Sequence, residues 1–132
     1  MTPVRVVVVD DDPLYAEGLA LTLAIDPRIA VAGIAHDGLE ALQLCRRKRP
    51  NVVLMDVHMP GLDGIETTRR IHDVLSGIRV VMLTSDDDPT ARESSAGAGA
   101  ARFLVKGASL EEVRDVVVSV SAQDTALPMP AA

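Results

Sequence analysis

Aromatic residues are scarce in this 132-residue sequence, which has one Tyr, one Phe and no Trp, and it has no excess of positive charge. Base stacking needs aromatic side chains, so the chain has almost nothing with which to hold unpaired bases. Its 13 Lys and Arg are outnumbered by 19 Asp and Glu, for a formal net charge of -6. Phosphate backbones are bound by clustered positive charge. We therefore expect no direct nucleic-acid binding by this segment.

Cysteine and long apolar runs are also scarce. The single cysteine, Cys45, excludes a disulfide within the chain and fits a reducing compartment. It lies at helical spacing among apolar residues, which predicts a position in the core. No apolar run approaches the length of a membrane span, and Met1 to Arg5 is too short for the charged start of a secretory signal. We expect a cytoplasmic domain without membrane contact.

Five short apolar runs alternate with five amphipathic segments along the chain. Short, β-branched runs are typical of strands buried on both faces. Each following segment opens with Asp or Ser, the residues that cap helix N-termini, so the helices are expected to begin beside these caps. The predicted strands are Val4 to Val9, Ile29 to Ala35, Val52 to Met55, Arg79 to Leu83 and Ala101 to Val105, and the predicted caps are Asp12, Asp37, Asp63, Asp88 and Ser109.

Apolar periodicity predicts how the helices pack. The helix from Thr90 to about Ala98 is rich in Ala, Ser and Gly, and we expect it to be the least stable element. The residues that recur at helical spacing are Leu14, Gly18, Leu21 and Ile25 in the first helix, Ala41, Leu42 and Cys45 in the second, Thr68, Ile71 and Leu75 in the third, and Val113, Val116, Val117 and Val120 in the last.

Alternating strands and helices predict an α/β fold, because parallel strands need crossover helices. We expect a single doubly wound (βα)5 domain, a flavodoxin-like parallel sheet of order 2-1-3-4-5, with its ligand site between strands 1 and 3. Gly33 weakens the second strand, which we therefore place at a sheet edge.

Acidic residues follow the two strands that flank this switch point. Asp10 and Asp11 end the first strand and Asp56 ends the third, whereas Asp12 is explained as a helix cap. Crowded carboxylates repel one another, which raises their pKa values unless a cation lies between them. With oxygen ligands and no His or Cys at ligand spacing, magnesium is the cation expected.

Two more polar residues end the neighbouring strands, Thr84 on the fourth and Lys106 on the fifth. A magnesium ion, the Lys106 ammonium and the Thr84 hydroxyl can each pair with one oxygen of a phosphoryl group. With Asp56 as the nucleophile, these parts can make an aspartyl-phosphate.

The same residues carry a family resemblance that covers about residues 4 to 121. Asp10-Asp11, the stretch from Met55 to Gly64, Thr84-Ser85, and the stretch from Phe103 to Lys106 together resemble the receiver domain of bacterial response regulators. The resemblance implies a phospho-acceptor rather than an enzyme. The phospho-acceptor takes its phosphoryl group from a sensor histidine kinase in two-component signalling.

The resemblance also implies residue roles. Asp56 accepts the phosphoryl group, and Asp11 and Asp56 bind magnesium directly, together with the backbone carbonyl of His58. Asp10 acts largely through water. Thr84 and Phe103 form the switch that reshapes the surface of helix 4, strand 5 and helix 5, and phosphorylation promotes a homodimer. His36 and His72 have no partners in sequence, and we expect them to be surface residues.

Two stretches, Asp-Asp-Asp-Pro-Leu-Tyr near the start and Lys-Gly-Ala-Ser-Leu-Glu-Glu near the end, are most similar to receivers that precede a LuxR-type helix-turn-helix domain. We expect residues 1–122 to form the receiver and 123–132 a linker or disordered tail, with no output domain in this sequence. The receiver then controls transcription through a DNA-binding domain outside it. The alternative is a stand-alone receiver that acts as a protein-binding module.

Two other protein classes compete with this interpretation. Haloacid-dehalogenase-type phosphatases also form an aspartyl-phosphate, but they place a second Asp two residues after the nucleophile, where this chain has His58. Flavodoxin-like cofactor binders use a Gly, Ser or Thr phosphate loop after the first strand, where this chain has three acids.

Overall fold

A five-stranded parallel sheet forms the centre of the molecule, with strand order β2-β1-β3-β4-β5. The computed structural model describes residues 2–126, and their side chains as far as residue 122. The expected flavodoxin-like α/β fold and strand order are confirmed. In chain order the elements are β1 (Val4–Val9), α1 (Pro13–Ala24), β2 (Ile29–Ala35), α2 (Gly38–Lys48), β3 (Val52–Asp56), α3 (Gly64–Val74), β4 (Arg79–Thr84), α4 (Pro89–Gly97), β5 (Arg102–Val105) and α5 (Leu110–Ala126).

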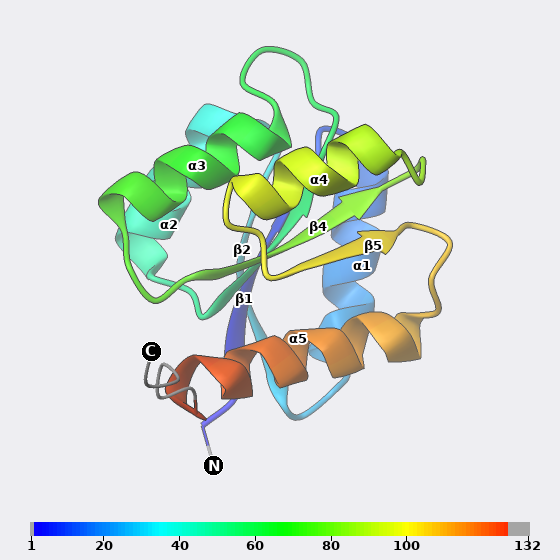
Figure 1. The fold of residues 1–132 in the computed structure, drawn as a ribbon. Helices are drawn as coiled ribbons and strands as arrows, with labels where there is room; N and C mark the ends of the chain where they lie inside the picture. The colour runs from blue at the N-terminus through cyan, green and yellow to red at the C-terminus, as the bar shows by residue number, and fades with distance from the viewer. Residues whose placement is uncertain (1, 127–132) are drawn as a thin grey trace.

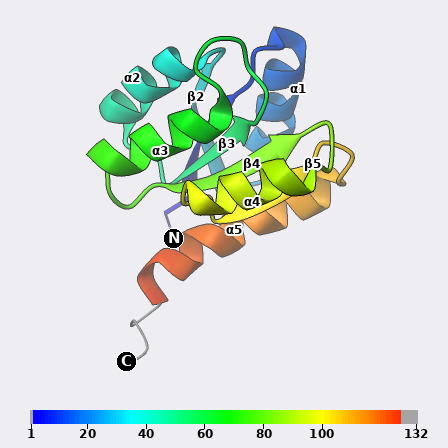
Figure 2. The same ribbon diagram turned by 45° about the horizontal axis from the view of Figure 1, so that its top comes forward.

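Helices cover both faces of the sheet (Figures 1 and 2): α1 and α5 lie on one face, and α2, α3 and α4 on the other. Alternate residues of one strand therefore enter different cores. In β1, Val7 and Val9 pack toward α2 and α3, whereas Val6 and Val8 pack toward α1 and α5. Because both faces are buried, the strand is apolar throughout, and each valine contributes roughly 1.5–3 kcal/mol of transfer free energy.

The second strand lies at a sheet edge, as its Gly33 predicts. The register shifts by one residue between Val6 and Val7 of β1, so that Val6 pairs with Val31 and Val7 with Gly33. A Cβ atom on Gly33 would lie 2.9 Å from a methyl carbon of Leu44 in α2. The small residue thus lets α2 pack closely over the edge strand.

All five predicted helix caps are confirmed. The Asp12 carboxylate accepts a hydrogen bond from the backbone N–H of Leu14 at 3.1 Å, and the Asp37 carboxylate accepts one from Glu40 at 2.8 Å. Asp63, Asp88 and Ser109 accept bonds from Glu66, Thr90 and Glu112 in the same way. These interactions satisfy N–H groups that the first turn of a helix leaves without a helical partner.

The first helix does not bury the residues that recur at helical spacing. Leu14, Leu21 and Ile25 are 82%, 72% and 75% exposed, and the buried residues of α1 are Ala16, Ala20 and Leu23. The helix is apolar nearly all round, with Glu17 and Thr22 as exceptions, so periodicity cannot select a face. The helix buries the side that carries the small alanines, because that side can approach the sheet closely. Packing against the sheet therefore decides which side is buried. In α2, α3 and α5 the predicted inner residues are buried, Cys45 among them.

His36 and His72, expected at the surface, are both half-buried, and each ring contacts a backbone carbonyl. The Nδ1 atom of His36 lies 3.0 Å from the backbone oxygen of Asp10. The ring of His72 lies between two carbonyls, with Nδ1 3.1 Å from Ala98 O and Nε2 3.3 Å from Ile78 O. These partners are distant in sequence, so they meet the rings only in the folded chain.

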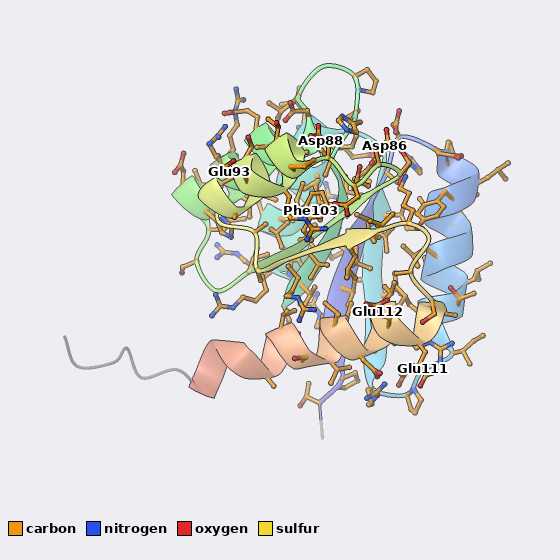
Figure 3. The ribbon with its side chains drawn as sticks, turned by 45° about the vertical axis from the view of Figure 1, so that its right-hand side comes forward. Asp86, Asp88, Glu93, Phe103, Glu111 and Glu112 are labelled. Carbon is orange, nitrogen blue, oxygen red and sulfur yellow. The ribbon has the colours of Figure 1, made fainter. Side chains whose placement is uncertain are left out.

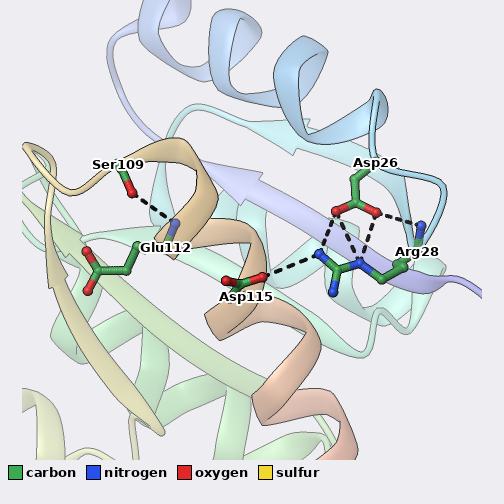
Figure 4. A network of polar contacts seen from close by, with 5 residues as sticks. All are labelled: Asp26, Arg28, Ser109, Glu112 and Asp115. Atoms are coloured by element: carbon green, nitrogen blue, oxygen red, sulfur yellow. Dashed lines mark hydrogen bonds and ion pairs between the residues drawn. The ribbon is translucent and has the colours of Figure 1, made fainter.

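A charged network ties the α1–β2 connection to α5 (Figure 4). The Arg28 guanidinium donates to the Asp26 carboxylate at 2.8 Å and reaches Asp115 of α5 at 3.4 Å. Hydrogen bonds from the Arg28 side chain and backbone lower the pKa of Asp26 to about 2. The contact holds the start of β2 against the last helix.

The last helix is longer than expected. It continues to Ala126, whereas we expected the linker or tail to begin at residue 123. The remaining expected tail, residues 127–132, lies outside the described residues. Within residues 2–126, we find no helix that combines the length and the apolar character a bilayer span requires.

Candidate functional site

The carboxyl ends of β1 and β3 bring three carboxylates together. These strands are adjacent and parallel, and oxygens of Asp10, Asp11 and Asp56 lie within 4.8 Å of one another. Asp10 and Asp56 are only 2% and 5% exposed, whereas Asp11 is open to solvent. The cluster expected from the strand ends is present, with one member facing outward.

The backbone around Asp56 is held from two sides. Asp56 closes β3 opposite Leu83 of β4, and the N–H of Val57 donates to the Leu83 carbonyl at 3.1 Å. The N–H of Gly64, at the start of α3, donates back to the Val57 carbonyl at 3.0 Å. The loop between β3 and α3 therefore returns to the strand end it leaves, and it fixes the backbone that carries the central carboxylate.

Lys106 supplies a positive charge to the cluster. Its ammonium donates to Asp10 Oδ2 at 2.7 Å and lies 3.6 Å from Asp56 Oδ1. The backbone N–H of Lys106 donates to the Thr84 carbonyl at 2.7 Å, which positions the residue at the end of β5. Burial lowers the pKa of Lys106, but the hydrogen bond to Asp10 and the nearby acids outweigh it and raise the pKa. The side chain is therefore an ammonium at neutral pH.

The pKa of Asp56 is raised from 3.8 to about 6. Burial is the largest cause, the negative charge of Asp10 adds to it, and the Lys106 ammonium opposes both. Contact with the Asp11 carboxyl raises the pKa further. The expected rise is thus confirmed for Asp56, but loss of hydration contributes more than repulsion between the carboxylates.

This raised pKa predicts a pH dependence of stability. Between about pH 4 and pH 6 the folded protein binds a proton on Asp56 that the unfolded chain has released, so the free energy of unfolding falls as the pH rises. Asp56→Asn removes this dependence. The measurement is urea unfolding without divalent cations. From pH 4.5 to pH 7, we expect the free energy of unfolding of the variant to rise by about 1–2 kcal/mol relative to that of the native chain. Parallel pH profiles of the two proteins would contradict the assignment.

Thr84 is fully buried beside the cluster, at the end of β4. Its hydroxyl oxygen accepts a hydrogen bond from the backbone N–H of Asp86 at 3.3 Å. Phe103 is half-buried and packs against the core on the side of α2, α3 and α4. The Arg92 guanidinium lies 4.6 Å from the centre of its ring and donates to Asp87 at 2.8 Å. His58 is exposed.

One neighbour of the site was missed by the sequence analysis. Lys106 Nζ lies 4.4 Å from the centre of the Tyr15 ring. Tyr15 belongs to the first turn of α1, and no pattern in the sequence links that turn to the distant end of β5. The only available signal was the position of an aromatic residue shortly after the acidic pair.

Comparisons with known proteins agree with this geometry. Residues 6–118 match the family model described as the response regulator receiver domain. The chain is 36% identical over 115 residues to the probable transcriptional regulatory protein NarL of Mycobacterium tuberculosis, covering 87% of this chain and 53% of that protein. It is 39% identical over 119 residues to the response regulator GacA of Pseudomonas aeruginosa, covering 90% and 56%. The chain thus spans about half the length of these curated relatives.

Solved structures show the same likeness. The signal receiver domain of the Mycobacterium tuberculosis NarL has a TM-score of 0.88 at 34% identity, covering 92% of this chain and 98% of that one. A LuxR-family regulator from an Aurantimonas species has a TM-score of 0.88 at 30% identity, covering 92% and 87%. A CheX–CheY–BeF3–Mg complex from Borrelia burgdorferi has a TM-score of 0.81 at 26% identity, covering 89% of both chains. With its acidic cluster at the predicted strand ends, this chain belongs to the response regulator receiver domain family.

Proposed function

We propose that Asp56 accepts a phosphoryl group from a phosphohistidine of a sensor histidine kinase. The observation that carries the proposal is the cluster itself, in which a buried carboxylate at a strand end lies within 4.8 Å of two others and 3.6 Å from an ammonium. A carboxylate so placed is a nucleophile surrounded by groups that suit phosphoryl oxygens. The chain is a phospho-acceptor rather than an enzyme with separate substrates.

The donor set fits magnesium. Carboxylate oxygens are the ligands this cation prefers, and the cluster offers three of them within 4.8 Å. Asp11 and Asp56 would hold the ion directly with the backbone carbonyl of His58, and Asp10 would act largely through water. The bound ion would neutralise charge on the phosphoryl oxygens. Magnesium in the Borrelia burgdorferi complex supports this proposal.

The chain's own residues account for the transfer. An Asp56 carboxylate oxygen forms a bond to phosphorus while the bond from phosphorus to the donor imidazole nitrogen breaks, and the electron pair of that bond stays with the imidazole. The Lys106 ammonium, 3.6 Å from Asp56, pairs with one phosphoryl oxygen. The Thr84 hydroxyl donates to another, and in doing so it turns toward Asp56.

The movement of Thr84 would operate the switch. Phe103 turns into the space that Thr84 leaves and gives up the Arg92 guanidinium that lies over its ring. The surface of α4, β5 and α5 changes shape as a result. The new charge shifts the equilibrium only as far as its contacts differ between the two conformations.

Acidic residues flank Phe103 on the switch surface, and the Arg92 guanidinium lies over its ring. Figure 3 shows Asp86, Asp88 and Glu93 on the side of α4 and Glu111 and Glu112 at the start of α5, with Phe103 between these groups. Such a surface repels phosphate backbones. This supports the proposal that the segment itself binds no nucleic acid.

We therefore propose that the switch controls transcription through a DNA-binding output domain of the LuxR type, outside these 132 residues. The likeness to a probable transcriptional regulatory protein and to a LuxR-family structure supports this. The receiver would extend through the end of α5 at Ala126. Phosphorylation would promote a homodimer. We propose that the domain acts in the cytoplasm. Its cysteine, Cys45, is free and buried, which fits a reducing compartment.

Intact-protein mass after incubation with acetyl phosphate tests the proposed function. We expect one phosphoryl adduct on the native chain with magnesium, little without it, and none on Asp56→Asn. The phosphorylated sample should sediment as a dimer and show changed amide exchange in α4, β5 and α5. A folded native chain without an adduct would overturn the proposal and leave the protein-binding module as the better account.

A further inference from the structure

The ring of Tyr15 forms one wall around the Lys106 ammonium. Tyr15 is half-buried in the first turn of α1, and its backbone N–H is held by the Asp12 carboxylate at 3.4 Å. Asp12 in turn donates its own N–H to Asp10 Oδ1 at 2.9 Å. The loop that positions the acidic cluster therefore also positions the ring.

Three groups surround the ammonium in the structure. Asp10 Oδ2 lies 2.7 Å from Lys106 Nζ, Asp56 Oδ1 lies 3.6 Å away, and the centre of the Tyr15 ring lies 4.4 Å away. Lysine has a long flexible side chain, and this one is 20% exposed. The bond to Asp10 restrains the ammonium on one side only. Without the ring, the ammonium could therefore turn toward solvent. An aromatic face within about 6 Å attracts a cation and restricts that freedom.

The ring is a neutral aromatic in this setting. Burial raises the pKa of Tyr15, the Lys106 ammonium opposes the rise, and the charges of Asp10 and Asp56 add to it. The phenol therefore keeps its proton, and its ring face is what meets the ammonium.

We infer that Tyr15 is a positioning residue for phosphoryl transfer: its ring holds the Lys106 ammonium where the incoming phosphoryl oxygen arrives. This inference rests on the proposed function of Asp56. It assigns the work to the aromatic face and not to the hydroxyl. Tyr15→Phe therefore keeps the positioning of the ammonium, and Tyr15→Leu weakens it.

Two measurements test the inference. The first is the NMR chemical shift of the Lys106 ε protons, which a nearby ring face moves upfield. We expect this shift in the native chain and Tyr15→Phe, and its absence in Tyr15→Leu. The second is the rate of phosphorylation by acetyl phosphate at saturating magnesium, which should fall by about fivefold to twentyfold in Tyr15→Leu and stay within about twofold of native in Tyr15→Phe.

A double-mutant cycle separates positioning from packing. In a Lys106→Met background, Tyr15→Leu should change the rate by less than about twofold, because no ammonium is left to hold. An equal loss in both backgrounds, or a loss in Tyr15→Phe, would overturn the inference. If Tyr15→Leu loses its helical circular dichroism, Tyr15→Met takes its place in both measurements. A native chain without a phosphoryl adduct would contradict the proposed function, whereas unshifted Lys106 protons would contradict the positioning role alone.

Discussion

Asp11→Asn lowers the affinity of the chain for magnesium by about 100-fold or more, whereas Asp12→Asn changes it by less than about threefold. Both variants remove one negative charge from the same loop, so they differ only in the place of that charge. Asp11 belongs to the carboxylate cluster, whereas the Asp12 carboxylate caps α1 by accepting hydrogen bonds from backbone N–H groups of its first turn. Asparagine is as good a helix cap as aspartate, so the control variant keeps its structure.

Titration calorimetry with magnesium chloride at neutral pH measures both affinities. The Asp11 carboxylate is exposed and contacts Asp56, so its loss removes a ligand without leaving a cavity. Equal weakening by the two variants would mean that the field of the acidic loop attracts the ion without direct ligation by Asp11. The proposed ligand set would then be wrong.

Gly64→Ala lowers the free energy of unfolding by about 3 kcal/mol or more. A Cβ atom on Gly64 would overlap the carbonyl oxygen of Asp56 and lie 2.9 Å from its carbonyl carbon and 3.0 Å from Met55 Cγ. Two of these contacts are with backbone at the end of a buried strand, which cannot move aside without breaking the pairing of β3 with β4. The same substitution should also displace the nucleophile and slow its phosphorylation.

Gly18→Ala is the matched control. Gly18 lies within α1, and a Cβ there meets no other atom within 4 Å. Alanine favours a helix interior over glycine, so this variant should gain about 0.5–1 kcal/mol. Urea unfolding of both variants gives the comparison. A Gly64→Ala protein as stable as the native chain would show that α3 can shift away from the site without cost.

The sequence by itself determined the elements and the place of the site. Apolar runs and capping residues are local signals, and β1 and β2 begin and end where those signals predict. The parallel direction of the strands follows from the alternation of strands and helices, and the order 2-1-3-4-5 is the common doubly wound choice for five strands. Because the carboxyl ends of parallel strands meet at one edge of the sheet, Asp10, Asp11 and Asp56 could be brought together from their positions in the chain alone.

Only the tertiary structure decided how the elements pack around that edge. The buried side of α1 depends on how closely Ala16 and Ala20 let the helix approach the sheet, since its periodicity suits either face. The contacts of His36 and His72, and the ring of Tyr15 against Lys106, join residues far apart in the sequence. Such contacts depend on distances between whole elements, and short-range sequence patterns carry no information about those distances.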